Sequence, residues 1–355
     1  MRIKAVLRAI VKAIVMTTGL MSLAVLLIGC GAAPAREPPD SPSAAPPATP
    51  PPITLVANLD QAPVEWSEVA FLPGGDGPDE IGLDPCVHCE AVVPAALAVG
   101  PDGSYWIADS YRRRIVHFAE DGSFIEAIPT ERGPADLAFV GERLYVLFEE
   151  GGRTIAAVES GALGESVMMT AAGQPLHVLA FVGQQDQLLA WFTDAEETLG
   201  RFWAMGAIDP ATGEVTPALG IQVWGDLFMD LVPLLETRPL SYEVRWSEAG
   251  QLIRQQQIRF QLVRDSRPVR TTVGDTYIRT STPTGFATLV SIGDGQGLPV
   301  GVWYLEIPAD GGQPTFERIP RDAFIGDAIR YVALGPDGRT YWMRLLEDGL
   351  HIYRR

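Results

Sequence analysis

Short apolar runs separated by tight Gly/Asp turns recur along residues 54–355. The clearest copy begins at Leu97 and reads LAVGPDG, followed by the aromatic run YWI at Tyr105. A second copy begins at Val332 and reads VALGPDG, followed by YWM at Tyr341. An apolar run, a Gly/Asp turn and an aromatic run are typical of a β-hairpin. The pattern therefore predicts that the chain repeats one β-hairpin unit.

Four weaker copies lie between these two, at steps of 40, 44, 39, 49 and 64 residues from Tyr105 to Tyr341, and the mean step is close to the period of a β-propeller blade. Their candidate second strands are residues 144–146, 188–191, 227–229 and 276–278, with 287–292 as the other choice in the fifth copy. Candidate third strands are residues 115–118, 154–158, 202–208, 242–246, 302–307 and 350–353. Candidate fourth strands follow five of these, at residues 124–128, 167–170, 215–219, 252–262 and 316–319.

The sixth copy lacks a fourth strand because the chain ends at Arg355. The apolar segment 64–72 has no other partner, so we expect it to pair beside residues 350–353 and remove the open edge. The predicted fold is all-β: a six-bladed β-propeller with ring closure by an N-terminal strand. A large two-sheet sandwich is the competing fold, although a sandwich would not require six copies of the hairpin unit in the same order along the chain. In the fourth copy, residues 225–237 also fit a helix.

The first 29 residues have the layout of a secretory signal peptide. Four basic residues precede a 16-residue apolar stretch, residues 13–28, which is shorter than the about 20 residues of a membrane span. The stretch ends in Leu27-Ile28-Gly29-Cys30, which resembles the bacterial lipobox. That resemblance implies cleavage before Cys30 and acylation of its thiol, so that the mature protein is anchored to the lipid bilayer outside the cytoplasm. An uncleaved anchor with an incidental cysteine is the alternative.

Residues 30–53 are predicted to be a stalk between the lipidated cysteine and the folded domain. Nine prolines occur in residues 31–53, with hardly any large apolar side chain between them. Such a segment cannot build a core and favours polyproline II. The predicted organisation is a signal peptide at 1–29, the acylated Cys30 and stalk at 30–53, and the propeller at 54–355.

The charge balance excludes one class of partner. The chain has 27 Lys and Arg against 44 Asp and Glu, a net charge of −17, and four of the basic residues precede the apolar stretch. A strongly acidic domain repels phosphate backbones, so nucleic-acid binding is not expected.

Cys86-Val87-His88-Cys89 is the most specific motif beyond the lipobox. A disulfide between Cys86 and Cys89 suits an oxidising compartment. Metal binding and redox exchange are the alternatives. The acidic neighbours Asp84 and Glu90 disfavour the thiolate that both would need. We therefore expect a structural disulfide and no cofactor.

The first copy, residues 95–128, resembles an NHL repeat through Asp102-Gly103, Ile107-Ala108-Asp109-Ser110, Arg114-Ile115 and Asp121-Gly122-Ser123-Phe124. The resemblance is weaker in the copy at Gly335 and absent from the middle copies. It implies a propeller fold but no single activity, since NHL propellers include enzymes, scaffolds and binding modules.

In such propellers, ligands often bind on the face formed by the loops between second and third strands and between blades. The residues at 71–94 and 108–114 belong to that face. Asp109 is close enough in sequence to pair with Arg114, which would stabilise the turn. Arg112 and Arg113 are expected to be less constrained than the Asp109–Arg114 pair, and are candidates to bind a carboxylate or an anionic head group. Asp109, Arg112 and Arg113 are therefore the candidate binding residues.

Two function classes remain. The first is a tethered binding or scaffolding lipoprotein, acting through one propeller face on an envelope protein, a peptide or a carbohydrate. The alternative is a metal-dependent propeller hydrolase or lyase, with the acidic residues of 76–84 as candidate ligands. Gluconolactonase and paraoxonase families resemble this fold and use Glu, Asp and Asn ligands, but Asn58 is the only asparagine and precedes the ring. The propeller-type amidating lyase uses histidines, and His117 and His351 are expected on third strands, away from the channel.

Overall fold

The computed structural model describes residues 50–82, 94–148, 154–171, 173–184, 187–193, 204–217, 221–224, 227–234, 241–248, 251–281, 284–294, 299–319, 332–346 and 348–355. All regular structure in these ranges is β-strand. No helix in the described part of the chain is long and apolar enough to cross a membrane. The predicted signal peptide, Cys30, Cys86 and Cys89 lie outside the described residues.

Most strands form antiparallel sheets in which neighbours in the chain are neighbours in the sheet. Sheet one is β3 (Ala96–Val99), β4 (Tyr105–Asp109), β5 (Arg114–Phe118) and β6 (Phe124–Pro129). Sheet two is β7 (Pro134–Val140), β8 (Arg143–Phe148) and β9 (Thr154–Glu159), with the short β10 (Ala162–Leu163) and β11 (Val167–Met168) on β9. Sheet three is β14 (His177–Gln184), β15 (Gln187–Thr193), β16 (Ala204–Ile208) and β17 (Val215–Pro217). A two-residue pair, β12 (Thr170–Ala171) and β13 (Gln174–Pro175), precedes sheet three.

The second half of the chain continues the same arrangement. Sheet four is β18 (Ile221–Trp224), β19 (Leu227–Leu234), β20 (Ser241–Glu248) and β21 (Gln251–Arg264), with β22 (Arg267–Pro268) at its end. Sheet five is β23 (Thr272–Ser281), β24 (Gly285–Gly293), β25 (Pro299–Pro308) and β26 (Thr315–Ile319). Sheet six is β27 (Val332–Leu334), β28 (Thr340–Leu346) and β29 (Gly349–Arg354), completed by β2 (Ser67–Pro73) from the start of the domain.

The repeated Gly/Asp turn folds in the same way in both of its clear copies. Between β3 and β4, Gly100 and Ser104 are joined by a backbone hydrogen bond of 2.8 Å, and the carboxylate of Asp102 accepts the Ser104 N–H at 3.1 Å. Gly103 has a φ of +84°, a left-handed conformation that glycine adopts without strain. The turn at 335–339 between β27 and β28 has the corresponding hydrogen bonds and a glycine φ of +73°. The predicted hairpin unit is confirmed at both positions.

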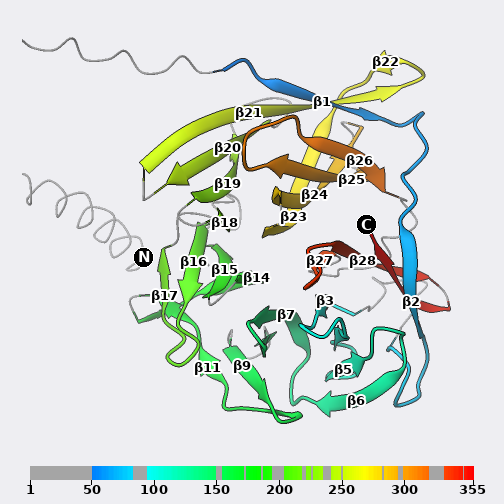
Figure 1. Cartoon of the computed structure of the whole chain (residues 1–355), viewed down its shortest axis with the longest axis vertical. Helices are drawn as coiled ribbons and strands as arrows, with labels where there is room; N and C mark the ends of the chain where they lie inside the picture. The colour runs from blue at the N-terminus through cyan, green and yellow to red at the C-terminus, as the bar shows by residue number, and fades with distance from the viewer. Residues whose placement is uncertain are drawn as a thin grey trace, which may run out of the picture. The chain divides into compact units, whose positions relative to one another are not determined.

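The expected pairing of the N-terminal segment with the last strand is present: β2 begins three residues and ends one residue later than predicted, and β29 extends one residue further at each end. Phe71 pairs antiparallel with His351 and Leu72 with Leu350. Figure 1 shows β2 beside the C-terminal end of the chain. The pairing covers an edge of β29 that would otherwise carry unpaired backbone groups.

Two alternatives that the sequence left open are resolved. Residues 227–234 form strand β19, in agreement with the predicted second strand at 227–229 and not with the alternative helix, because they pair along their whole length with β20. The assignment of 276–278 as a second strand was wrong, since these residues belong to the first strand of sheet five, β23, and the second strand is β24, which contains the other candidate, 287–292. Both outcomes depend on strand pairing, which apolar patterning alone does not specify.

An additional strand, β1 (Ile53–Asn58), pairs in parallel with the outer strand β21, with Ile53 opposite Ile258. Residues 51–66, here called the strap, then link successive sheets. Gln256 of β21 donates a hydrogen bond to the Pro51 carbonyl at 2.7 Å. Arg318 of β26 donates to the Leu59 carbonyl at 2.9 Å. Figure 1 shows the blue segment passing from β1, beside β21, towards β2.

Among the described residues, four apolar clusters lie between the sheets. Sheets one and two share one cluster, and sheets two and three share another. A third cluster joins sheets three, four and five, and a fourth joins five, six and one. Among the first strands, β3 contacts both β7 and β27, β7 contacts β14, and β23 contacts β14, β18 and β27. Each sheet is therefore packed against the next one in the chain, and sheet six is packed against sheet one.

Candidate functional site

The turn between β4 and β5, residues 109–114, is organised around a buried carboxylate. Asp109 ends β4 and is 0% exposed. Its oxygens accept hydrogen bonds from the Gly82 N–H at 3.2 Å, the Arg112 N–H at 3.4 Å and the Arg114 Nε at 2.8 Å. A buried charge requires such compensation. The predicted pairing of Asp109 with Arg114 is confirmed, and its role is to fix the turn.

Arg112 and Arg114 hold a second segment, residues 74–82, against this turn. Arg112 donates from Nη1 to the Gly77 carbonyl at 3.0 Å and forms an ion pair with Asp76 at 2.6 Å. Arg114 donates to the Pro78 carbonyl at 2.9 Å and also contacts the carbonyl of Glu80. The expectation that Arg112 is a free basic residue was wrong, because its guanidinium satisfies backbone carbonyls of the segment and its side chain is only 15% exposed.

The tip of the turn has a fixed backbone and solvent-facing side chains. Arg113 has a φ of +50°, donates its N–H to Ser110 at 3.2 Å and accepts a hydrogen bond from Thr130 at 2.8 Å. Arg113 and Tyr111 are both exposed, with Tyr111 at 47%. Neither side chain is bonded to another described residue. The turn therefore presents an aromatic ring and a guanidinium at its surface, and Tyr111 is a residue that the sequence analysis missed.

The described residues include no group of three or more His, Cys, Asp or Glu side chains that could hold a metal ion. The acidic cluster expected at 76–84 is described only as far as residue 82, and its Asp76 carboxylate is fully exposed and paired with Arg112. His117 lies on β5 and His351 on β29, the third strands of their sheets, as the sequence predicted.

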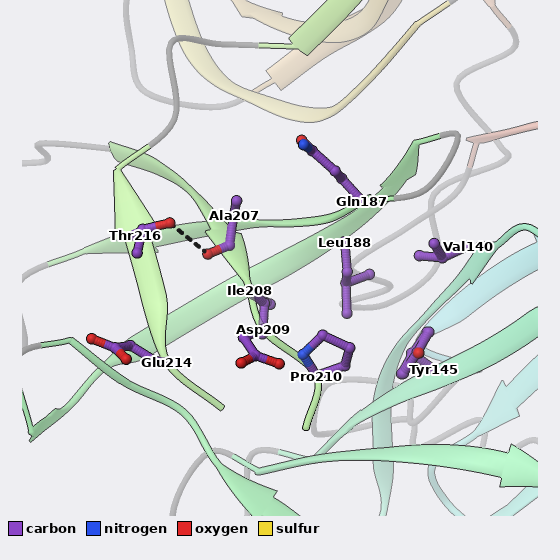
Figure 2. Close-up of a pocket in the computed structure, with 10 residues that line it drawn as sticks. All are labelled: Val140, Tyr145, Gln187, Leu188, Ala207, Ile208, Asp209, Pro210, Glu214 and Thr216. Atoms are coloured by element: carbon purple, nitrogen blue, oxygen red, sulfur yellow. Dashed lines mark hydrogen bonds between the residues drawn. The ribbon is translucent and has the colours of Figure 1, made fainter. Parts of the chain in front are cut away.

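A cavity of about 380 Å³ lies between sheets two and three. Figure 2 shows Val140 and Tyr145 on one side of it and residues from β16 and β17 on the other. Its lining is Val140, Tyr145, Gln187, Leu188, Ala207, Ile208, Asp209, Pro210, Glu214 and Thr216. These residues lie beside the β7–β8 and β16–β17 turns and at the start of β15. In an antiparallel sheet, first-to-second and third-to-fourth turns lie at the strand ends opposite the second-to-third turn. The cavity and the turn 109–114 therefore use opposite strand ends.

The chemistry of the cavity comes from the turn between β16 and β17. Asp209 accepts the Ala211 N–H at 2.9 Å and the Thr212 hydroxyl at 2.9 Å. These hydrogen bonds lower the pKa of Asp209, first through the Ala211 N–H and then through the Thr212 side chain. Asp209 is therefore ionised at neutral pH. The sequence predicts strands at β16 and β17 but carries no signal for the cavity, which depends on how two sheets pack.

No family model matches this sequence, and no curated protein matches it. Among solved structures, the chain is similar to a gluconolactonase from Xanthomonas campestris, at 13% identity and a TM-score of 0.45, covering 83% of this chain and 99% of that one. It is similar to the WD40 β-propeller domain of Doa1, at 11% identity and a TM-score of 0.39, covering 82% and 97%. It is also similar to a PQQ-bound aldose sugar dehydrogenase from Streptomyces coelicolor, at 11% identity and a TM-score of 0.43, covering 82% and 99%.

Proposed function

We propose that this protein is a membrane-tethered, extracytoplasmic binding lipoprotein whose folded domain is a six-bladed β-propeller. Six sheets, each with three or four main strands in chain order, support six blades. Shared apolar clusters between consecutive sheets, including sheets six and one, support a closed ring. The pairing of β2 with β29 supports closure of the ring by an N-terminal strand, and the resemblance of residues 95–128 to an NHL repeat supports an NHL-like first blade.

The tether is the acylated Cys30, followed by the proline-rich stalk up to residue 53. Two or three acyl chains anchor a protein stably, whereas a single chain is marginal. The proposal predicts that the wild-type protein incorporates a fatty-acid label and that Cys30→Ala does not. An undiminished label on Cys30→Ala would refute the tether without affecting the fold.

The turn 109–114 carries the proposed binding role. Its backbone is fixed by the buried Asp109 and by Arg114, whereas Tyr111 and Arg113 face solvent. A rigid turn loses little conformational entropy on association. Tyrosine and arginine are also enriched among the residues that contribute most to protein–protein binding. The partner is an envelope protein with a carboxylate for the Arg113 guanidinium beside an apolar area for the Tyr111 ring.

Two surface variants test this role. Arg113→Glu reverses the charge at the turn, and Tyr111→Ala removes the ring, and neither removes a side chain or a backbone hydrogen bond that fixes the turn. Arg339→Glu is the matched control, because Arg339 is an exposed turn residue at the opposite strand ends of sheet six. Both turn variants should reduce cross-linking of the full-length protein to its partner in its own membrane by about tenfold, while the control leaves it unchanged. Equal cross-linking by all three variants would refute the assignment of this turn.

A further inference from the structure

The hairpin at the end of β21, residues 259–270, carries the largest group of exposed arginines that lack an acidic partner. Most other exposed arginines of the described residues form ion pairs with carboxylates, namely Arg143, Arg245, Arg339 and Arg355. Apart from Arg113 in the turn 109–114, the exposed arginines that form no ion pair with any described residue are Arg259, Arg264, Arg267 and Arg270. We call residues 259–270 the basic hairpin, a local concentration of positive charge on a chain with a net charge of −17.

The register of the basic hairpin fixes where its arginines lie. Arg264 is directly opposite Arg267 in the antiparallel pairing of β21 and β22. Like charges at opposite positions of a strand pair destabilise it, so this pairing is not explained by a contribution to the fold. Side chains alternate along β21, where Phe260 is buried and Arg259 is exposed, so Arg259 lies on the face opposite to Arg264. Positive charge is therefore present on both faces of the hairpin.

The Asp60 carboxylate fixes the turn of the basic hairpin without neutralising its arginines. Asp265 and Ser266 at the tip have φ values of +51° and +58°, and their N–H groups donate to the two Asp60 oxygens at 3.1 Å each. Asp60 forms no ion pair with a described residue. The four arginines also outnumber the two carboxylates of this region, those of Asp60 and Asp265. The strap therefore holds the turn, and the hairpin keeps an excess of positive charge.

The basic hairpin lies beside the strand that leads into the domain. Strand β1 pairs in parallel with β21, from Ile53 opposite Ile258 to Asn58 opposite Val263. Figure 1 shows the yellow β22 projecting beside the blue β1. The chain before residue 50 carries the proposed tether, so the tether leads into the same sheet that carries the hairpin.

Anionic lipid head groups match this surface better than a protein partner does. Among residues 259–270, no large apolar side chain is exposed, whereas the centre of a protein interface is rich in apolar and aromatic residues. Guanidinium groups bind phosphate oxygens strongly, often through two parallel hydrogen bonds. Membrane anchoring is also more stable when an acyl anchor is combined with a basic patch.

We propose that the basic hairpin docks onto anionic lipid head groups of the bilayer that anchors the protein. Arg264, Arg267 and Arg270 bind lipid phosphates and give the domain a second contact with the bilayer beside the acyl anchor. The proposal rests on the tether of the proposed function but not on the turn 109–114.

The experiment uses the mature protein, purified from its own membrane and reconstituted into vesicles. A fluorophore attached at Ser266→Cys transfers energy to acceptor-labelled lipid head groups when the hairpin approaches the bilayer. Vesicles with about 30% phosphatidylglycerol should give at least about twofold more transfer than pure phosphatidylcholine vesicles, and about 0.5 M NaCl should remove the difference because salt screens exposed charges. The same label at Ser123→Cys, in the exposed β5–β6 turn of sheet one, should show no such difference.

Charge-neutralising variants assign the effect to the arginines. The test variant replaces three arginines of the hairpin by glutamine, namely R264Q, R267Q and R270Q, and should abolish the lipid-dependent transfer from position 266. The control variant removes the same number of positive charges from arginines that are paired with carboxylates, namely R143Q, R245Q and R339Q. The control variant should keep the lipid-dependent transfer. Melting temperatures of both variants show that they remain folded.

Failure of the tether and failure of the hairpin give different results. A protein that phosphatidylcholine vesicles do not retain shows that the tether has failed. Its cosedimentation with phosphatidylglycerol vesicles, lost in the test variant, would still support the hairpin, and no cosedimentation would overturn it. For the retained protein, equal transfer in the two kinds of vesicle, equal transfer from positions 266 and 123, or an unchanged signal in the test variant would overturn the proposal.

Discussion

Arg114 and Asp109 form an ion pair of 2.8 Å in which the carboxylate is completely buried and the arginine side chain is 12% exposed. The same arginine donates to backbone carbonyls of residues 74–82, and the same carboxylate accepts the N–H of Gly82. Asp109 and Arg114 therefore bond both to each other and to the segment 74–82, which is far from them in the sequence. The pair builds the surface turn rather than acting on a ligand, and the residues available for binding are the ones beside it.

Removing the carboxylate should destabilise the domain. Asp109→Ala leaves the Arg114 guanidinium buried without its counter-ion and removes the acceptor of the Gly82 N–H. Breaking one partner of a buried ion pair costs about 3 kcal/mol or more. Urea unfolding of Asp109→Ala measures the loss. Glu159→Ala is the control, because the side chains of Glu159 and Arg143 in its ion pair are 58% and 52% exposed. Loss of this exposed pair should reduce the free energy of unfolding by less than about 1 kcal/mol. Equal losses in both variants would contradict the structural role of Asp109.

The strap and β2 should be essential for a monomeric domain. Trp66 at the end of the strap is 8% exposed and packs edge-on against Tyr304 and Trp342, with ring centroids 5.6 and 5.7 Å away. Trp66→Ala should cost about 3 kcal/mol or more. Deletion of residues 54–72 also exposes the edge of β29 and should cause aggregation. Light scattering and thermal melting measure both effects. A deletion variant that stays monomeric with an unchanged melting temperature would contradict closure by β2.

Stability should depend on pH through His117. Burial lowers the pKa of His117 below its ordinary value of 6.5, and Glu126 at 3.6 Å opposes this only in part. The unfolded chain therefore binds more protons than the folded one below pH 6.5, so stability is complete above that pH and decreases as the pH falls towards the lower, folded pKa. His117→Phe keeps an aromatic ring stacked on Trp106 and should reduce the fall in melting temperature between pH 7.5 and about 5.5. An identical fall in both proteins would exclude His117 as the cause.

Cys86 and Cys89 lie outside the described residues, and the disulfide between them stays a prediction. The wild-type protein should be two hydrogens lighter under non-reducing conditions than after reduction. Cys86→Ser with Cys89→Ser should remain folded and lose on the order of 2 kcal/mol or less, because a short loop removes little chain entropy. Free thiols in the purified protein, or stoichiometric zinc protecting them from alkylation, would favour a metal site instead.

Local pattern predicted most of the strands but not all of their partners. The Gly-Pro-Asp-Gly turns at Gly100 and Gly335 specify their hairpins because each needs only its own residues. Strand β1 spans the predicted boundary between stalk and propeller, and the sequence did not indicate it as a strand of the sheet because the partner of Ile53, Ile258, is 205 positions away. Nothing near residue 53 in the sequence indicates that pairing.

For the candidate binding residues too, the sequence predicts the local contacts but not those between distant segments. Asp109 and Arg114 are close in sequence, so their pairing was predictable. Arg112 reaches Gly77 across 35 positions, and this contact depends on how the segment 74–82 folds back over the turn. The cavity at Asp209 and Tyr145 depends on the packing of two sheets, which apolar periodicity does not encode.

The central claim is that the tethered domain binds an envelope partner through Tyr111 and Arg113. Its most direct test places a photo-cross-linking amino acid at position 111 of the full-length protein in its own membrane. Position 124 is the control, because Phe124 is also an exposed aromatic residue of sheet one, at 38%, but lies on β6. The account predicts one discrete cross-linked species from position 111, absent from position 124 and lost with Arg113→Glu. The same products from both positions, or a product that is insensitive to Arg113→Glu, would contradict it.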